Sequence, residues 1–182
     1  MKSKQRSRLM LILLLVAFGA PFVTAVVLRF GGWQPGSTRN YGVLIQPPQD
    51  WSALALKTQA GDDYPWDPQA RRWHLLVLPP APCGDLCLQQ ADMLHRLWLS
   101  EGRRADKLDV LWPGHWPDGL ERFGGLREIA LPDALRAQVP VAATEQDGMA
   151  LALVDHNGFL VITYAAGFEP NRMRRDLDRL VK

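Results

Sequence analysis

The stretch RWHLLVLPPAPCGDLCL, residues 72–88, contains the strongest structural signals of the sequence. Its apolar run at residues 75–78 is typical of a buried strand, which we expect to span residues 73–78. Prolines follow directly, and proline ends a strand because it has no N–H group to donate to the ladder. A helical pattern of apolar residues then occupies residues 83–101, and Gly102 is a favourable place for that helix to end.

Both cysteines of the protein, Cys83 and Cys87, lie where this strand passes into the helix. Cys87 falls in the first helical turn, where the backbone N–H groups and the helix dipole favour the thiolate. The thiolate is the form that attacks disulfides and that binds soft metals such as Cu(I). Four residues apart on a helix, the two side chains share a face and can approach each other. The alternative is a structural disulfide, although so short a loop constrains little chain entropy.

Length and composition limit the classes of protein that fit. The chain has 182 residues and a formal net charge of +2, which suits one domain plus an extra segment and gives no indication of nucleic-acid binding. Two cysteines form a single pair and not a disulfide scaffold. The pair is therefore structural, redox-active or metal-binding.

The extra segment is an uncharged, mostly apolar run at residues 9–28, and about 20 such residues cross a bilayer as a helix. A basic N-terminus, residues 1–8, precedes it and no comparable basic cluster follows, so the positive-inside rule places the N-terminus in the cytoplasm. A cleaved signal peptide is the alternative, with a weak small-residue site at residues 23–25. We favour an uncleaved anchor because the apolar run continues past that site.

This anchor predicts a single-pass protein of the bacterial inner membrane. A linker rich in Gly, Ser and Pro is expected at residues 29–41, and a domain at residues 42–182. With the N-terminus in the cytoplasm, that domain lies in the periplasm, where disulfides can form.

The order of elements predicts an α/β domain of thioredoxin-like type, with a central mixed sheet and flanking helices. A second core strand at residues 107–112 completes the strand–helix–strand crossover of a parallel sheet. Strands at residues 150–154 and 159–164, joined by the turn signal DHNG at residues 155–158, predict a hairpin. A terminal amphipathic helix begins at Pro170. Four shorter elements are also expected: edge strands at residues 42–46 and 54–58, and helices at residues 120–123 and 132–138.

These features resemble the SCO/SenC type of thioredoxin-fold protein tied to cytochrome c oxidase copper-site assembly. Within that type, they are most similar to small membrane-anchored, oxidase-associated proteins of proteobacteria. The resemblance rests on the N-terminal anchor, the spacing CGDLC at residues 83–87, the hairpin sequence LVDHNG at residues 153–158 and the C-terminal helix, and it covers most of residues 70–182. It implies Cu(I) as cargo and a cytochrome c oxidase subunit, or its assembly factors, as partner.

The sequence departs from the family pattern in two places. In the family a copper-binding histidine precedes the hairpin aspartate, and the matching position here holds Asp147. The nearest histidine is His156, inside the turn, and it is our first choice for a third metal ligand beside the two cysteines. A thioredoxin-type reductase usually has a cis-proline just before this hairpin strand, where the sequence reads Gly148 and Met149. A thioether at Met149 could also bind Cu(I), although a lone methionine near a strand usually fills the core.

Three functions follow from these residues. The first, preferred because of the resemblance, is an oxidase assembly factor that delivers Cu(I) or keeps acceptor cysteines reduced, with Cys83 and Cys87 as ligands or redox pair. The second is a general periplasmic thiol–disulfide oxidoreductase, in which Cys83 attacks and Cys87 resolves the mixed disulfide. The third is a non-catalytic domain that holds an oxidase subunit through its surface. The sequence leaves the metal, the partner and the redox direction open, and with them whether the protein is an enzyme.

Overall fold

The structure is a computed structural model that describes residues 2–31, 39–141 and 148–181. The chain divides into two compact units, residues 1–39 and residues 40–182.

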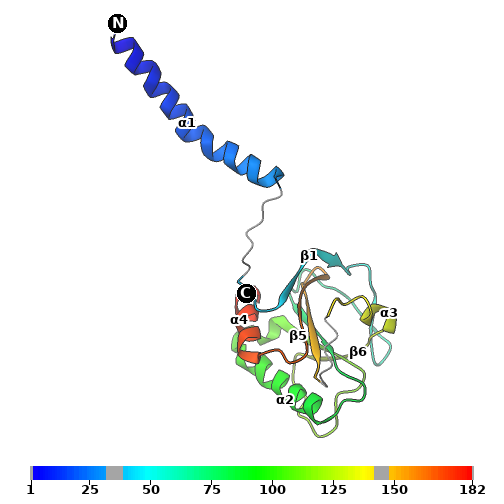
Figure 1. The fold of residues 1–182 in the computed structure, drawn as a ribbon. Coiled ribbons are helices and arrows are strands. Elements are labelled where there is room, and N and C mark those ends of the chain that lie inside the picture. The colour runs from blue at the N-terminus through cyan, green and yellow to red at the C-terminus, as the bar shows by residue number, and fades with distance from the viewer. Residues whose placement is uncertain (1, 32–38, 142–147, 182) are drawn as a thin grey trace. The chain divides into compact units, whose positions relative to one another are not determined.

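The first unit consists of the helix α1 (Lys2–Phe30), drawn in blue in Figure 1. Its part Gln5–Phe30 is long and apolar enough to cross a membrane, and none of its most apolar window is buried within the protein. Pro21 lies inside the helix, as proline often does in membrane-spanning helices. These properties support the predicted membrane anchor, and the helix extends beyond the predicted apolar run at both ends.

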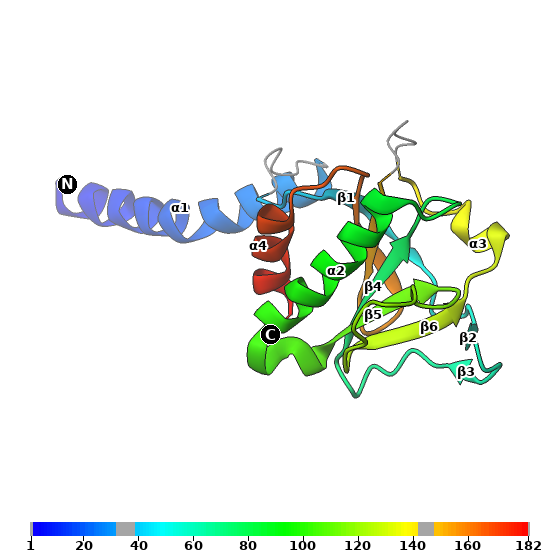
Figure 2. The same cartoon turned by 90° about the horizontal axis from the view of Figure 1, so that it is seen from below.

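The second unit is built on a mixed eight-stranded sheet with the order β1-β8-β7-β4-β5-β6-β2-β3 (Figures 1 and 2). The strands β4, β5 and β6 are parallel, while β7 is antiparallel to β4 and β8 is antiparallel to β7. The strands are β1 (Val43–Asp50), β2 (Leu56–Thr58), β3 (Asp63–Tyr64), β4 (Trp73–Leu78), β5 (Leu108–Pro113), β6 (Leu126–Ala130), β7 (Ala150–Val154) and β8 (Phe159–Tyr164). The helices are α2 (Asp85–Ser100), the 3-10 helix η1 (Gly102–Lys107), α3 (Asp133–Arg136) and α4 (Pro170–Leu180).

Strand β4 lies in the middle of this sheet and contributes side chains to both faces. Leu75 and Val77 belong to the core beneath α2 and α4, whereas Leu76 and Leu78 belong to the core on the face of α3. Successive side chains of a strand point to opposite faces, so a strand covered on both faces reads as a continuous apolar run. This explains why the sequence LLVL at residues 75–78 is apolar without interruption.

The predicted strand–helix–strand unit, the hairpin and the terminal helix are all confirmed, with small shifts in their ends. The helix predicted at residues 83–101 begins at Asp85, because Gly84 is extended and forms its N-cap. It ends at Ser100, and Gly102 has the left-handed backbone angle that favours glycine, with φ of 56°. The short helix predicted at residues 132–138 is α3.

Two expectations about shorter elements were wrong or incomplete. Residues 120–123 form no helix; Phe123 instead stacks on the His95 ring, with centroids 5.0 Å apart. The edge strand predicted at residues 42–46 is β1, which continues to Asp50 through Pro47 and Pro48. Proline is tolerated there because β1 lies at the edge of the sheet and its register with β8 shifts between Leu44 and Gln49. Strand β6 was not predicted.

Candidate functional site: the cysteine pair at the start of α2

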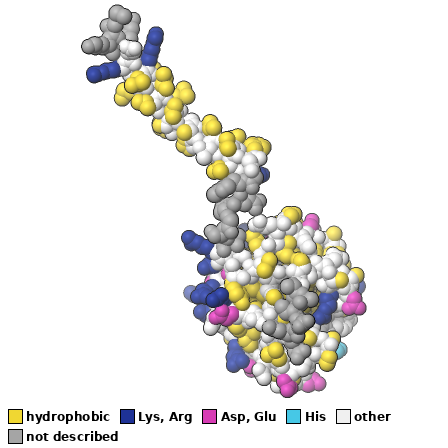
Figure 3. All heavy atoms as spheres, in the orientation of Figure 1, with side chains coloured by type: hydrophobic (Ala, Val, Ile, Leu, Met, Phe, Trp, Pro, Cys, Tyr) yellow, Lys and Arg dark blue, Asp and Glu magenta, His cyan; other side chains and the backbone are white. Residues whose placement is uncertain are grey.

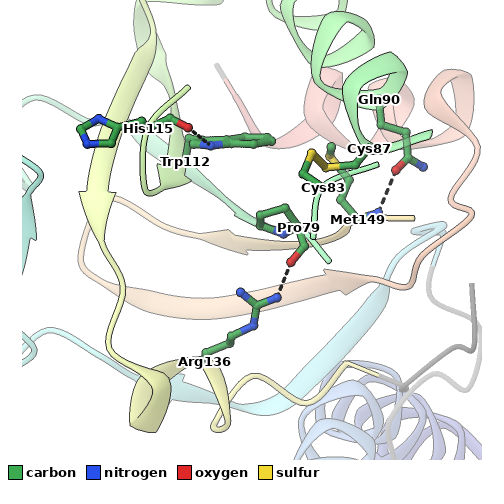
Figure 4. The surroundings of a disulfide bond; sticks show 8 residues. All are labelled: Pro79, Cys83, Cys87, Gln90, Trp112, His115, Arg136 and Met149. Carbon is green, nitrogen blue, oxygen red and sulfur yellow. Dashed lines mark hydrogen bonds between the residues drawn. A yellow bond between two sulfur atoms is a disulfide. The ribbon is translucent and has the colours of Figure 1, made fainter. Parts of the chain in front are cut away.

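The two cysteines form a disulfide at the junction between β4 and α2 (Figure 4). Their Cα atoms are 5.3 Å apart. Cys87 is completely buried, in the first turn of α2, whereas Cys83 is only partly buried and precedes the helix. The structure therefore brings together the two residues that the sequence singled out, and it gives them unequal access to solvent.

The local sequence explains this placement. Pro79 and Pro80 follow the last residue of β4 and prevent the strand from continuing. The helix then starts at Gly84, whose carbonyl oxygen accepts the first helical hydrogen bond from the Leu88 N–H at 3.0 Å. Asp85 places a carboxylate in the first turn, where negative charge is favourable. The thiols are thus held at the N-terminus of a 16-residue helix.

Met149 directly precedes β7, at the place where the sequence resemblance predicts a cis-proline for a reductase. It is fully buried, and Figure 4 shows its side chain directed toward the disulfide. Its N–H donates a hydrogen bond to Oε1 of Gln90 on α2, at 2.7 Å. A Cβ atom added to Gly148 would lie 3.2 Å from the amide nitrogen of Gln90, so glycine suits this close approach of the chain to the helix. The strand β7 is therefore fixed to α2 directly beside the cysteine pair.

The remaining border of the pair is mostly apolar. The indole of Trp112, at the end of β5, lies on the other side of the disulfide from Gln90 in Figure 4. Its N–H donates to the carbonyl oxygen of His115 at 3.0 Å, which uses its only polar group. Below the pair, the carbonyl oxygen of Pro79 accepts a hydrogen bond from Arg136. The disulfide consequently lies in an apolar setting with its one partly exposed edge at Cys83.

The structure does not bring His156 to the cysteines. Strand β7 runs antiparallel to β4, so that Ala150 pairs with Leu78 near the cysteines while Val154 pairs with His74 at the far end of β4. Five residues of strand span about 15 Å, which separates the turn containing His156 from the disulfide. The His156 ring instead lies near Trp73, with centroids 6.5 Å apart. The predicted set of two cysteines and His156 is therefore not assembled.

Within the described residues, no group of three or more His, Cys, Asp or Glu side chains is arranged to hold a metal ion. The position matching the family's copper-binding histidine, Asp147, lies outside the described residues.

A second cluster of polar residues, which the sequence reasoning missed, lies at the far end of β4. His74 and Asp109 are neighbours on β4 and β5 and are only 2% and 3% exposed. The hydroxyl of Tyr64 donates to Oδ2 of Asp109 at 2.9 Å and lies 2.9 Å from Nδ1 of His74. Because a phenol has one proton, Nδ1 of His74 must be the donor to Tyr64. A charged residue inside the apolar run LDVLW was the signal that could have revealed this cluster.

The surroundings keep His74 neutral and Tyr64 protonated at neutral pH. Burial lowers the pKa of His74 to about 4, although the Asp109 carboxylate acts in the opposite direction. Burial and the same carboxylate raise the pKa of Tyr64. The Arg127 and Arg72 guanidinium groups lie 3.2 and 3.5 Å from Oδ1 of Asp109 and compensate its charge. A cavity of about 230 Å³ adjoins the cluster. Apart from Nε2 of His74, which is buried without a hydrogen-bond partner, the polar atoms of the cluster pair with one another, so we interpret the cluster as structural.

The match to a protein family comes from the sequence. A profile of the family described as transmembrane-like, thioredoxin-like, C-terminal domain matches residues 73–182, more than half of the chain. The chain belongs to this family. No curated protein matches the sequence.

Solved structures with the same fold include Sco1 and peroxiredoxin-like proteins. Yeast Sco1 with copper bound has a TM-score of 0.51 at 11% identity, covering 79% of this chain and 93% of that chain. A SCO1/SenC family lipoprotein from Bacillus anthracis has a TM-score of 0.50 at 12% identity, covering 76% and 99%. The bacterioferritin comigratory protein of Xanthomonas campestris has a TM-score of 0.51 at 12% identity, covering 80% and 98%. These similarities confirm the thioredoxin-like fold class.

Proposed function

We propose that this protein is a membrane-anchored, Sco-like thiol–disulfide exchange protein that reduces a cysteine pair of a partner protein. The observation that carries the proposal is the unequal exposure of its own pair, since Cys83 is partly exposed and Cys87 is completely buried. A two-step exchange needs one thiol that a partner can reach and a second that acts only within the protein. A purely structural disulfide has no need of this difference.

The reaction proceeds from the reduced pair. The Cys83 thiolate attacks one sulfur of the partner's disulfide, which forms a mixed disulfide and releases the first partner sulfur as a thiolate that takes up a proton. The Cys87 thiolate then attacks Sγ of Cys83, closes the disulfide seen in the structure and releases the second partner sulfur. The partner gains two electrons and two protons, and the pair loses them. A dithiol protein upstream returns the pair to its reduced form.

The position of the pair supports this chemistry. The N-terminus of α2 stabilises a thiolate because its unpaired N–H groups and dipole favour negative charge there. The apolar surroundings at Met149 and Trp112 exclude water from the buried side of the disulfide. Cys83 retains the exposed edge through which a partner sulfur can enter in line.

The proposed target is the copper-site cysteine pair of a cytochrome c oxidase subunit, in the periplasm of a bacterium. Two considerations support this setting. The sequence resembles the SCO/SenC type. The fold is shared with yeast Sco1, whose crystal structure has copper bound. Helix α1 would hold the exchange domain at the membrane in which such a subunit resides.

Delivery of Cu(I) is the second candidate, and the position of Met149 is the observation in its favour. Two thiolates and a thioether are the soft ligands that Cu(I) prefers, and the Met149 side chain is directed toward the cysteine pair. In this arrangement Met149, and not His156, would be the third ligand. Cu(I) would be cargo carried by the reduced pair.

A trapping experiment on the full-length chain tests the exchange function. The Cys87→Ser variant, reduced and mixed with a disulfide-bonded peptide, is expected to accumulate a mixed disulfide at Cys83, because no second thiol can resolve it. The matched Cys83→Ser variant is expected to form on the order of 1000-fold less, since its remaining thiol is buried. Equal trapping by both variants, or by neither, would contradict the proposed exchange.

A competition titration separates copper delivery from exchange. Reduced full-length protein is titrated with Cu(I) against a chromophoric chelator, with the Met149→Leu variant beside it as a control of similar volume. Copper delivery requires one tight equivalent that weakens about tenfold in Met149→Leu and disappears in the double Cys→Ser variant. If the protein exchanges disulfides at Cys83 but does not compete with the chelator for Cu(I), only the redox function is supported.

A further inference from the structure

The basic residues of the second unit are concentrated on α4 and η1, although the unit as a whole is acidic. Six of the 21 Lys and Arg residues lie at positions 1–39, where there is no Asp or Glu, so residues 40–182 hold 15 basic against 19 acidic side chains. Together, α4 and η1 hold seven Lys and Arg against three Asp. Figure 3 shows Lys and Arg gathered along the side of the domain that α4 forms in Figure 1.

Three of these residues, Arg103, Arg174 and Arg175, form what we term the arginine face. All three are exposed, and none forms an ion pair with a residue that the structure describes. Other arginines nearby are occupied; for example, Arg104 lies 2.5 Å from Oδ1 of Asp178. The charge of Arg174 acts on the carboxyl group of Glu101, but without an ion pair between them. Exposed cations outside ion pairs are available to an anionic partner.

The first residues of the domain, Tyr41 and Gly42, contact α4. The N–H groups of Tyr41 and Gly42 donate to Oδ2 of Asp176, at 2.8 and 3.0 Å, and Asp176 is a buried residue of α4. The Tyr41 hydroxyl accepts a hydrogen bond from the N–H of Glu169, which precedes α4, at 2.9 Å. The guanidinium of Arg172 lies 5.5 Å from the centroid of the Tyr41 ring. The first residues of the domain are therefore fastened to α4.

The segment between α1 and the domain, residues 31–39, is short, and we term it the tether. Nine residues span at most about 30 Å, which limits the anions that the arginine face can reach. Because the tether joins the domain at α4, it keeps this helix within that distance of the bilayer that α1 crosses. Anionic phospholipids are the fixed negative charges within this reach, whatever soluble partner is present.

We propose that the arginine face binds the anionic phospholipid headgroups of the membrane in which α1 is anchored. Arginine suits this ligand because its planar guanidinium matches phosphate oxygens in a bidentate manner. Each basic residue close to an anionic bilayer raises the partition to it about fivefold, so three of them hold the domain by on the order of 100-fold. The proposal is independent of the exchange chemistry of the cysteine pair.

The test uses the full-length chain reconstituted in nanodiscs, either of phosphatidylcholine alone or with about one third phosphatidylglycerol. Phenylglyoxal modifies exposed arginines, and mass spectrometry gives the rate at each position. We expect Arg103, Arg174 and Arg175 to react about fivefold more slowly in the anionic discs. Arg71, which is exposed in the segment before β4, should react equally in both. About 0.5 M NaCl should remove the difference, because it screens exposed charges.

A pair of variants separates the arginine face from net charge. Arg172 is exposed on α4 and should also be modified more slowly in the anionic discs. Replacement of the three arginines of the arginine face by Gln should abolish this protection of Arg172. The matched variant replaces the exposed residues Lys57, Arg71 and Arg122 by Gln and removes the same charge elsewhere, so protection of Arg172 should persist. Equal modification rates in both kinds of disc, as expected if the face binds an acidic protein, would overturn the proposal. Loss of protection in both variants would overturn it as well.

Discussion

The two ends of strand β4 hold chemically reactive side chains in opposite environments. After its last residue, the Cys83–Cys87 disulfide lies among apolar neighbours such as Met149, with one sulfur partly exposed. At its beginning, His74 is enclosed by a hydrogen-bonded cluster and only 2% exposed. The comparison shows that residue type alone does not mark a functional site. The sulfur of Cys83 keeps a partly exposed edge, whereas the Nδ1–H group of His74 is donated to Tyr64 inside a buried cluster.

The largest expected effect of a substitution concerns the apolar end. Met149→Ala opens a cavity beneath the disulfide, and truncation of a fully buried methionine is expected to lower the free energy of unfolding by about 4 kcal/mol. Met149→Leu preserves most of the volume and should lower it by less than about 1.5 kcal/mol. Urea unfolding of both variants measures the difference. Equal losses would mean that packing at this end does not depend on volume.

The polar end is expected to respond to pH. Burial lowers the pKa of His74 to about 4 in the folded protein, whereas an unfolded histidine titrates near pH 6.5. As the pH falls between these values, only the unfolded chain takes up the proton, so the free energy of unfolding falls by about 3 kcal/mol. Below about pH 4 both states are protonated and this loss is complete.

The matched variant for this prediction is His74→Gln, which should lack that component when unfolding is measured at pH 7 and pH 4.5. Burial raises the pKa of Glu101, which favours the folded protein as the pH falls, but this contribution is common to both proteins and cancels. Parallel pH profiles for the two proteins would show that His74 is not held neutral by its surroundings.

A smaller effect is expected from the hydroxyl that joins the polar cluster. Tyr64→Phe leaves Nδ1 of His74 and Oδ2 of Asp109 without their shared partner, which should lower the free energy of unfolding by about 2 kcal/mol. Exchange at the cysteine pair, at the other end of β4, should be unchanged. Thermal unfolding measures the loss of stability, and a peptide disulfide assay on the same sample measures the exchange rate. A parallel loss of exchange would show that the polar cluster and the cysteine pair depend on each other.

The smallest expected effect concerns an ion pair on the surface near the polar end. Lys57 and Asp63 lie 3.0 Å apart, with side chains 58% and 75% exposed. Lys57→Ala is expected to lower the free energy of unfolding by about 0.3 kcal/mol, because water already solvates both charges. A loss above about 1 kcal/mol would show that the polar end depends on this pair as well as on its buried cluster.

Much of the fold could be predicted because its central elements have strong local patterns. Strand β4 is a continuous apolar run closed by prolines, and the hairpin of β7 and β8 contains the turn signal DHNG. Strand β6 lacked such a pattern, because Arg127 and Glu128 interrupt its apolar residues at the half-buried side of the sheet. The two-residue strand β3 is shorter than any periodicity can reveal.

The candidate site was predictable in part. Its two cysteines could be named because they are the only ones and lie at a strand–helix junction. The position of His156 depends on the direction of β7, which pairs antiparallel with β4 and carries the turn away from the cysteines. The cluster of Tyr64, His74 and Asp109 forms across three strands, and no spacing along the chain encodes such a contact.

Rates of alkylation of the reduced full-length protein compare the reactivity of Cys83 with that of Cys87. Iodoacetamide is added in limiting amount at neutral pH, and mass spectrometry measures its incorporation at each cysteine. If Cys83 is the attacking thiol and Cys87 the buried resolving thiol, Cys83 should react at least about tenfold faster. Equal rates, or a faster reaction at Cys87, would contradict the assignment on which the proposed function rests.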